Sequence, residues 1–258
     1  MFAEQLRHEL RERRWSALSL GLILAACGVF IFAVTAGLSQ AIADLTNSFP
    51  KAVTVFIGGG SAGGYAVGEL FNLIAPAALV GYAVTVGGSM IAREEEKGTM
   101  SMLSAQPITR ASIVTFKSLA LLASLVFAAA LLWAGVAISS AVYRIGLDLA
   151  GLTAICVHLL FLAIAFGAIA IAGGALTGSP GLGTGVAGGL AVVAYASNAM
   201  LPLANLAGWA RLSPWYYFAG SNPLSTGIDG PHLLVLSAIA VVVMAAAYVG
   251  FSRRDLKG

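Results

Sequence analysis

The sequence predicts an all-α integral membrane protein with six transmembrane helices, an N-terminal interfacial amphipathic helix and a short cytoplasmic helix. Hydrophobic residues make up 59% of the 258 residues and charged residues only 10%, whereas soluble domains carry about 25% charged residues. The mean hydropathy is +0.91. Six apolar runs reach the roughly 20 residues that a helix needs to span the hydrocarbon. The polar stretches between them are too short to bury a core, so residues 1–258 form one transmembrane domain.

The charged residues indicate a membrane partner and no nucleic-acid partner. The net charge is +3, but the Lys and Arg residues stand at the ends of apolar runs, where they orient membrane helices. Cys27 and Cys156 both lie inside apolar runs. Because disulfides join cysteines in water-exposed loops, we interpret both as packing residues.

Residues 1–14 predict an amphipathic helix that lies in the inner membrane interface. Phe2, Leu6, Leu10 and Trp15 recur near helical spacing, and arginines and glutamates fill the other faces, as in helices that lie on membranes. The alternative is a charged tail that only anchors topology. A cleaved signal peptide is not expected, because the following apolar run is too long and the basic segment also contains acids.

Six stretches are predicted to span the membrane. Their ranges are 15–38, 70–92, 113–142, 151–176, 181–207 and 232–251. Only Thr177-Gly178-Ser179-Pro180 separates the fourth from the fifth. Gly and Pro stop a helix and turn the chain, which predicts a tight hairpin there. The alternative is one long broken helix and five spans in all.

The distribution of basic residues orients the six spans. With the N-terminus inside, 11 Lys and Arg residues fall on inner segments and 3 on outer segments, which accounts for all 14. Basic residues concentrate on the cytoplasmic side. We therefore expect a multi-pass protein of the cell inner membrane with both termini in the cytoplasm. Five spans would place Arg253, Arg254 and Lys257 outside.

The sequence offers no catalytic or metal-binding motif. The Gly-rich stretches 58–64 and 178–189 lack the Gly-Lys-Ser/Thr ending that places a lysine on phosphates, so the chain is expected to bind no ATP. Among ionisable residues within spans we single out His158, which we expect to bond a neighbouring helix rather than carry chemistry. The scarcity of buried carboxylates argues against an ion-coupled carrier.

Glycines in the fifth predicted span form a ladder. Gly181, Gly185 and Gly189 are spaced four apart, so they share one helix face and let two backbones approach closely. The ladder predicts either a self-association surface or a contact within one bundle.

The loop after the second predicted span has the features of a short helix. Three glutamates open it, Gly98 breaks the preceding helix, Thr99 can cap a new one and Pro107 ends it. Met100 and Leu103 would share one side of this helix. A helix between two spans that projects into the cytoplasm is suited to docking, whereas the alternative is a solvated loop with a chance run of charges.

This loop resembles the signature region of ABC-2 type permeases. The family pattern is an acid, Gly-Thr, a run of Leu or Met, Pro, Ser/Thr-Arg, and a Lys that opens the next span. The residues that match it are Glu94, Glu96, Gly98, Thr99, Met102, Leu103, Pro107, Thr109, Arg110 and Lys117. The triple glutamate and the methionines at 100 and 102 depart from the pattern. The Arg253-Arg254-Asp255-Leu256 tail also resembles the family.

The resemblance implies a permease subunit rather than an enzyme. Such a chain pairs with a second permease chain, identical or homologous, and with two copies of an ATP-binding cassette ATPase that carry the ATP and Mg²⁺. Segment 94–110 would be the coupling helix that contacts the ATPase, and the cargo would be a small hydrophobic or amphipathic compound for export. The alternatives are a secondary carrier, a membrane anchor without an ATPase partner, and a membrane-embedded enzyme.

Overall fold

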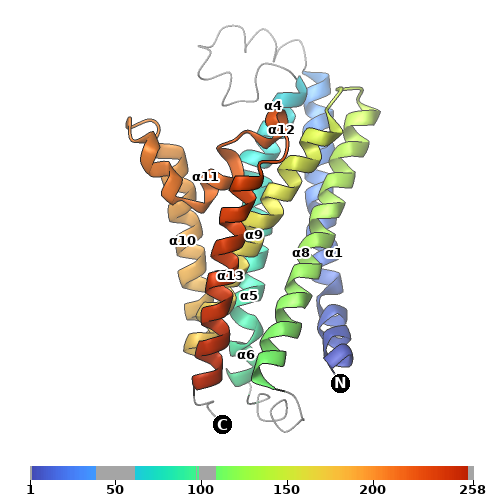
Figure 1. Ribbon diagram of the computed structural model, residues 1–258. Coiled ribbons are helices and arrows are strands. Elements are labelled where there is room, and N and C mark those ends of the chain that lie inside the picture. The colour runs from blue at the N-terminus through green and yellow to red at the C-terminus, as the bar shows by residue number, and fades with distance from the viewer. Residues whose placement is uncertain (1, 39–61, 97, 99–108, 255–258) are drawn as a thin grey trace.

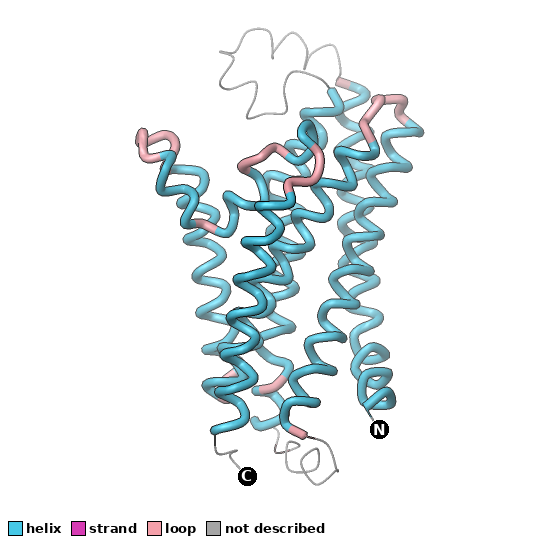
Figure 2. Tube along the Cα trace, viewed as in Figure 1, coloured by secondary structure: helices cyan, strands magenta, loops and turns pink. Residues whose placement is uncertain are grey.

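The computed structural model describes residues 2–38, 62–96, 98 and 109–254, and its regular elements in these ranges are all helices (Figure 2). The all-α class is therefore confirmed for the described residues. Helices suit a membrane because they satisfy their backbone hydrogen bonds within the segment. The elements are α1 (Phe2–Gly37), α4 (Ala62–Glu69), η1 (Leu70–Ile74), α5 (Ala75–Met90), α6 (Ala92–Glu96), α8 (Arg110–Val142), α9 (Leu149–Thr177), α10 (Pro180–Met200), η2 (Ala207–Leu212), α11 (Pro214–Ala219), α12 (Pro223–Thr226) and α13 (Gly230–Arg253).

Five helices in the described ranges are long and apolar enough to cross a membrane. They are Phe2–Gly37, Ala66–Met90, Arg110–Val142, Leu149–Thr177 and Gly230–Arg253, which correspond to five of the six predicted spans. The 21-residue α10 runs beside them (Figure 1) but is not among the five. Its five glycines replace side chains that would raise its mean hydropathy. The fifth predicted span, 181–207, therefore stays a prediction.

Helix α1 is longer than one membrane crossing. Its 36 residues run without a break from Phe2 to Gly37, so the predicted amphipathic segment and the first span form a single helix. At 1.5 Å per residue this helix is about 54 Å long, whereas the hydrocarbon core is about 30 Å thick. The charged first turns therefore extend beyond the apolar part.

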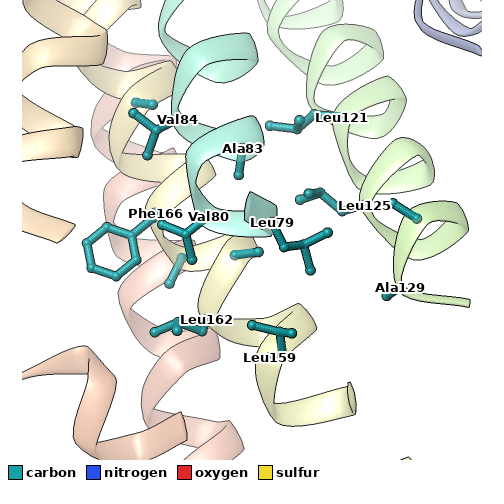
Figure 3. Close-up of a cluster of buried hydrophobic side chains, with 14 of the residues drawn as sticks. Leu79, Val80, Ala83, Val84, Leu121, Leu125, Ala129, Leu159, Leu162 and Phe166 are labelled. Atoms are coloured by element: carbon teal, nitrogen blue, oxygen red, sulfur yellow. The ribbon is translucent and has the colours of Figure 1, made fainter. Parts of the chain in front are cut away.

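Helix α9 lies at the centre of the bundle. It packs against α5, α8, α10 and α13 (Figure 1). Of its most apolar stretch 67% is buried, against 17% for α13. Figure 3 shows part of the core, to which α5 contributes Leu79 and Ala83, α8 contributes Leu121 and α9 contributes Leu162. In a membrane this packing stabilises by dispersion, because lipid tails are as apolar as the side chains.

Glycines bring α5, α9 and α10 together backbone to backbone. A Cβ on Gly183 of α10 would lie 2.6 Å from the backbone nitrogen of Gly174 in α9. A Cβ on Gly88 of α5 would lie 2.6 Å from the backbone nitrogen of Thr184. Neither space admits a side chain, so the three helices depend on glycine where they cross.

The predicted hairpin between the fourth and fifth spans is confirmed. Helix α9 ends at Gly178, whose φ of 67° is left-handed, a conformation that glycine adopts without strain. Ser179 caps α10 by accepting a hydrogen bond from Leu182 N, and Pro180 fills the first turn.

The two ends of the bundle hold different structures. The basal end is the end at which α1 begins and α13 ends, and it also holds α6 and the start of α8 (Figure 1). At the opposite, apical end, the chain beyond α10 folds back through η2 and α11 before α13 begins (Figure 1). The Ser213 hydroxyl secures this segment by donating to the carbonyl of Ala194 at 2.7 Å.

Candidate functional site

The basal end gathers charged side chains from helices that are distant in sequence. Lys117 is the centre of one group: it lies in the second turn of α8 and is 1% exposed. Its Nζ lies 2.5 Å from Oε1 of Glu9 in α1 and 3.3 Å from Oε1 of Glu94 in α6. Arg13 donates to the other oxygen of Glu9 at 3.0 Å. Burying a charge is costly without such partners, so these four residues depend on one another.

A second group joins α6 to the end of α13. Glu95 is buried, and Arg254 Nη2 donates to its Oε1. Gly178 in the α9–α10 turn lies beside this pair, because a Cβ there would stand 2.8 Å from Oε2 of Glu95. The hairpin glycine therefore provides the space in which Glu95 meets Arg254.

Arg110, at the start of α8, also contacts the end of α13. Its Nη1 donates to the backbone carbonyl of Arg254 at 2.6 Å and to that of Phe251 at 3.3 Å. The last carbonyls of a helix lack partners within the helix and attract cations. Arg110 thus caps α13 and ties the start of α8 to the C-terminal end.

Two consecutive glutamates connect α6 to both groups. Glu94 reaches Lys117, and through it α8 and α1, whereas Glu95 reaches Arg254 at the end of α13. Side chains of neighbouring residues in a helix point about 100° apart, so the side chains of residues 94 and 95 contact different helices. A displacement of the five-residue α6 would therefore act on both sides of the bundle.

The structure describes only part of the predicted coupling residues. Thr99, Met100, Met102, Leu103 and Pro107 lie outside the described residues. Gly98 has a φ of 69°, which agrees with its predicted role as a helix breaker. Glu96 is exposed and forms no ion pair with a described residue.

The acid that forms the second ion pair is Glu95, which the family pattern does not select. Sequence reasoning also did not foresee the pairing of Glu9 with Lys117. One signal was present, since Lys117 falls inside the range predicted for the third span, where an ionisable side chain needs a partner. His158 was not the only such residue.

The predicted glycine ladder lies on the outside of the described bundle. Gly181, Gly185 and Gly189 are exposed, and a Cβ on Gly185 or Gly189 would meet nothing within 4 Å. The close contact of α10 is made instead by Gly183 on its opposite side. Within the described residues the ladder therefore makes no close helix contact, and its predicted role as a contact surface stays a prediction.

His158 joins helices at the apical end, as the sequence predicted. It is fully buried, its Nδ1 lies 3.1 Å from the Tyr217 carbonyl, and its Nε2 accepts from Asp229 N at 3.1 Å. A nitrogen that accepts carries no proton, so Nδ1 holds the hydrogen and donates it. The neutral imidazole thus links α9 to α11 and to the start of α13.

Comparison with known families gives a match over nearly the whole chain. The sequence model of the family described as "ABC-2 family transporter protein" matches residues 5–256. The matched range contains every residue of the two charged groups. No curated protein matches the chain.

Proposed function

The chain belongs to the ABC-2 transporter family, and from this premise we propose that it is the membrane-spanning permease of a transporter driven by ATP hydrolysis on separate subunits. The observation that carries the coupling part of the proposal is the pair Glu94 and Glu95. These neighbours tie one short helix to both charged groups of the basal end.

The complete transporter contains two copies of an ATP-binding cassette ATPase and a second permease chain, identical or homologous. ATP and Mg²⁺ bind the ATPase. The exposed ladder of Gly181, Gly185 and Gly189 is the surface we assign to the second permease chain. The cargo is a small hydrophobic or amphipathic compound that is exported, a proposal supported by apolar helices with few ionisable side chains.

In this proposal α10 also crosses the membrane, which gives six spans in all, and both termini face the cytoplasm at the inner membrane. Two observations support it. The start of α1 and the end of α13 lie at the same end of the bundle (Figure 1), which requires an even number of crossings. The predicted inner segments also carry 11 of the 14 basic residues.

The ATPase docks on segment 94–110, with Met100 and Leu103 as apolar anchors. Movement of the docked ATPase displaces α6. Glu94 then passes this movement to Lys117 and α1, while Glu95 passes it to Arg254 and α13. Buried ion pairs suit this task because breaking one leaves an uncompensated charge, so the joined helices move together.

The test is copurification with the ATPase, together with transport-stimulated ATP hydrolysis, in Met100→Ala/Leu103→Ala. Buried apolar anchors dominate interface energetics, so we expect association to fall at least tenfold or hydrolysis to become independent of transport, while membrane insertion is unchanged.

The matched control is Met200→Ala/Leu203→Ala, which removes the same two side chains at the same spacing. Met200 and Leu203 lie at the apical end and are 66% and 85% exposed. We expect normal ATPase association in this control. Normal association and coupling in the Met100/Leu103 variant would refute docking on this segment.

A further inference from the structure

We propose that the groove between α1 and α8 binds one anionic phospholipid from the leaflet at the basal end, with the lipid phosphate on Arg14. The inference goes beyond the proposed function and requires no ATPase partner. It concerns a bound lipid that stays with the protein, and not the transported compound.

The groove lies between α1 and α8, which contact each other on its basal side and on its apical side. Toward the basal end, α1 and α8 are joined by the ion pair of Glu9 and Lys117 at 2.5 Å. Toward the apical end they meet at Gly135, where a Cβ would lie 2.7 Å from the Cα of Ala25. Between these contacts the helices leave a volume of about 350 Å³.

The walls of the groove are apolar and its rim is basic. Leu18 of α1 lines it together with Ala123 and Phe127 of α8, and Arg14 and Trp15 stand on the α1 side. The small side chain of Ala123 leaves room opposite Leu18. A volume of this size suits part of a small ligand, so one acyl chain enters near its glycerol end and the rest stays in the bilayer.

The positive charge beside the groove is available to a ligand. Arg7, Arg11 and Arg14 are exposed and share one face of α1 at spacings of four and three residues. Within the described ranges, Arg11 and Arg14 make no ion pair, whereas Arg13 is engaged by Glu9.

The nearby acids leave the Arg14 end of this face basic. Glu4 lies ten residues before Arg14 in α1, which is almost three helical turns. The carboxylate of Glu12 lies 3.9 Å from His8, on another face of α1.

Arg14 stands at the depth of lipid headgroups. Trp15, the next residue, is 66% exposed, and the Arg14 guanidinium carbon lies 5.4 Å from its ring centroid. Tryptophan concentrates at the membrane interface, and the part of α1 that holds no charged residue begins directly after it. A lipid phosphate bound to Arg14 would therefore lie at the depth of the other lipid headgroups, and an acyl chain of the same lipid would run along Leu18.

Charge decides which lipid is favoured. Each arginine near the surface strengthens attraction to an anionic headgroup. A phosphatidylcholine headgroup would instead bring its own cation toward Arg11 and Arg14. The groove should therefore prefer a headgroup with net negative charge.

The experiment reconstitutes the full chain in vesicles of phosphatidylglycerol and phosphatidylcholine in equal parts, and counts the lipids retained after extraction by native mass spectrometry. We expect about one phosphatidylglycerol per chain, preferred at least fivefold. Arg14→Gln should lower this preference about fivefold, the factor for one interfacial charge. Ala123→Phe should displace the lipid by filling the groove, and Arg144→Gln, which removes an exposed apical arginine, should change nothing.

Several outcomes would overturn the proposal. Equal retention of both lipids by the unmodified chain would exclude selection by charge. Retention unchanged in both Arg14→Gln and Ala123→Phe would place the lipid elsewhere. A chain that retains no lipid would refute a bound phospholipid in the groove. If Arg144→Gln lowered the preference for phosphatidylglycerol as much as Arg14→Gln does, the preference would depend on the total charge of the protein and not on the groove.

Discussion

In the part of the chain that the structure describes, charged side chains join the helices at the basal end, whereas neutral groups join them at the apical end. Lys117 connects three helices through Glu9 and Glu94. His158 connects its neighbours through the Tyr217 carbonyl and the Asp229 N–H. A broken ion pair leaves a buried charge, while a broken neutral bond leaves only an unpaired dipole. The basal end is thus the more sensitive to single substitutions.

Aromatic packing strengthens the contrast, because among the described residues one ring pair, Phe2 with Phe116, lies at the basal end and the others lie at the apical end. The ring of Trp215 in α11 lies 5.2 Å from that of Tyr195 in α10 and 6.4 Å from that of Phe166 in α9. Such pairs add about 0.5–1.5 kcal/mol each beyond area burial and distribute the stability of the apical end over many contacts. The basal end concentrates it on a few charges, which suits a region that must respond to a partner.

The largest effect is expected for Lys117→Met, which leaves Glu9 buried without its lysine. We expect the free energy of unfolding to fall by about 3 kcal/mol, the lower end of the usual cost of breaking a buried pair from one side, because Arg13 still pairs with Glu9. Denaturant unfolding in detergent measures it. Adding Glu9→Gln should recover part of the loss in a double-mutant cycle. No recovery would mean that the lysine acts through packing alone.

A smaller effect is expected for His158→Phe at the apical end. Phenylalanine fills a similar space but leaves the Tyr217 carbonyl and the Asp229 N–H without partners. We expect a loss of about 2 kcal/mol in unfolding free energy, the cost of such unsatisfied groups. His8→Phe is the control, because His8 is exposed and should change stability by less than about 0.5 kcal/mol. A loss at His158 as large as that at Lys117 would break the comparison of the two ends.

The smallest effect is expected for Glu95→Gln compared with Glu96→Gln. Glu95 is buried and bonded to Arg254, while Glu96 is exposed. Glutamine keeps the size of the side chain but weakens a charge-assisted bond, so we expect about 1 kcal/mol at Glu95 and less than about 0.5 kcal/mol at Glu96. Unfolding midpoints of the two variants measure the difference. The reverse order would favour the family pattern over the described contacts.

Much of the fold could be predicted because membrane helices follow from local sequence. An apolar run of about 20 residues has few alternatives to a helix in lipid. Four predicted spans therefore agree at both ends, within a few residues, with Ala66–Met90, Arg110–Val142, Leu149–Thr177 and Gly230–Arg253. The first predicted span agrees with α1 only at its end, because α1 begins at Phe2. In the segment Gly178-Ser179-Pro180 the glycine ends one helix, the serine caps the next and the proline begins it. The hairpin could therefore be predicted from these residues alone.

The candidate site was only partly predictable, because spacing along one helix does not say which face meets a neighbour. Gly181, Gly185 and Gly189, spaced four apart, were predicted to form a helix contact, but the close contact of α10 with α9 is made by Gly183. From the sequence of α10 alone, either the face with the ladder or the face with Gly183 could contact a neighbour. The position of α9 decides that the Gly183 face does.

By itself the sequence determined the membrane class, the helices and the basic character of the basal end, since each depends on composition or on short runs of residues. Tertiary structure alone decided that Glu94 meets Lys117 while Glu95 meets Arg254. Their partners lie 23 and 159 residues away, and only the packing of α6 between α8 and α13 brings those charges within reach.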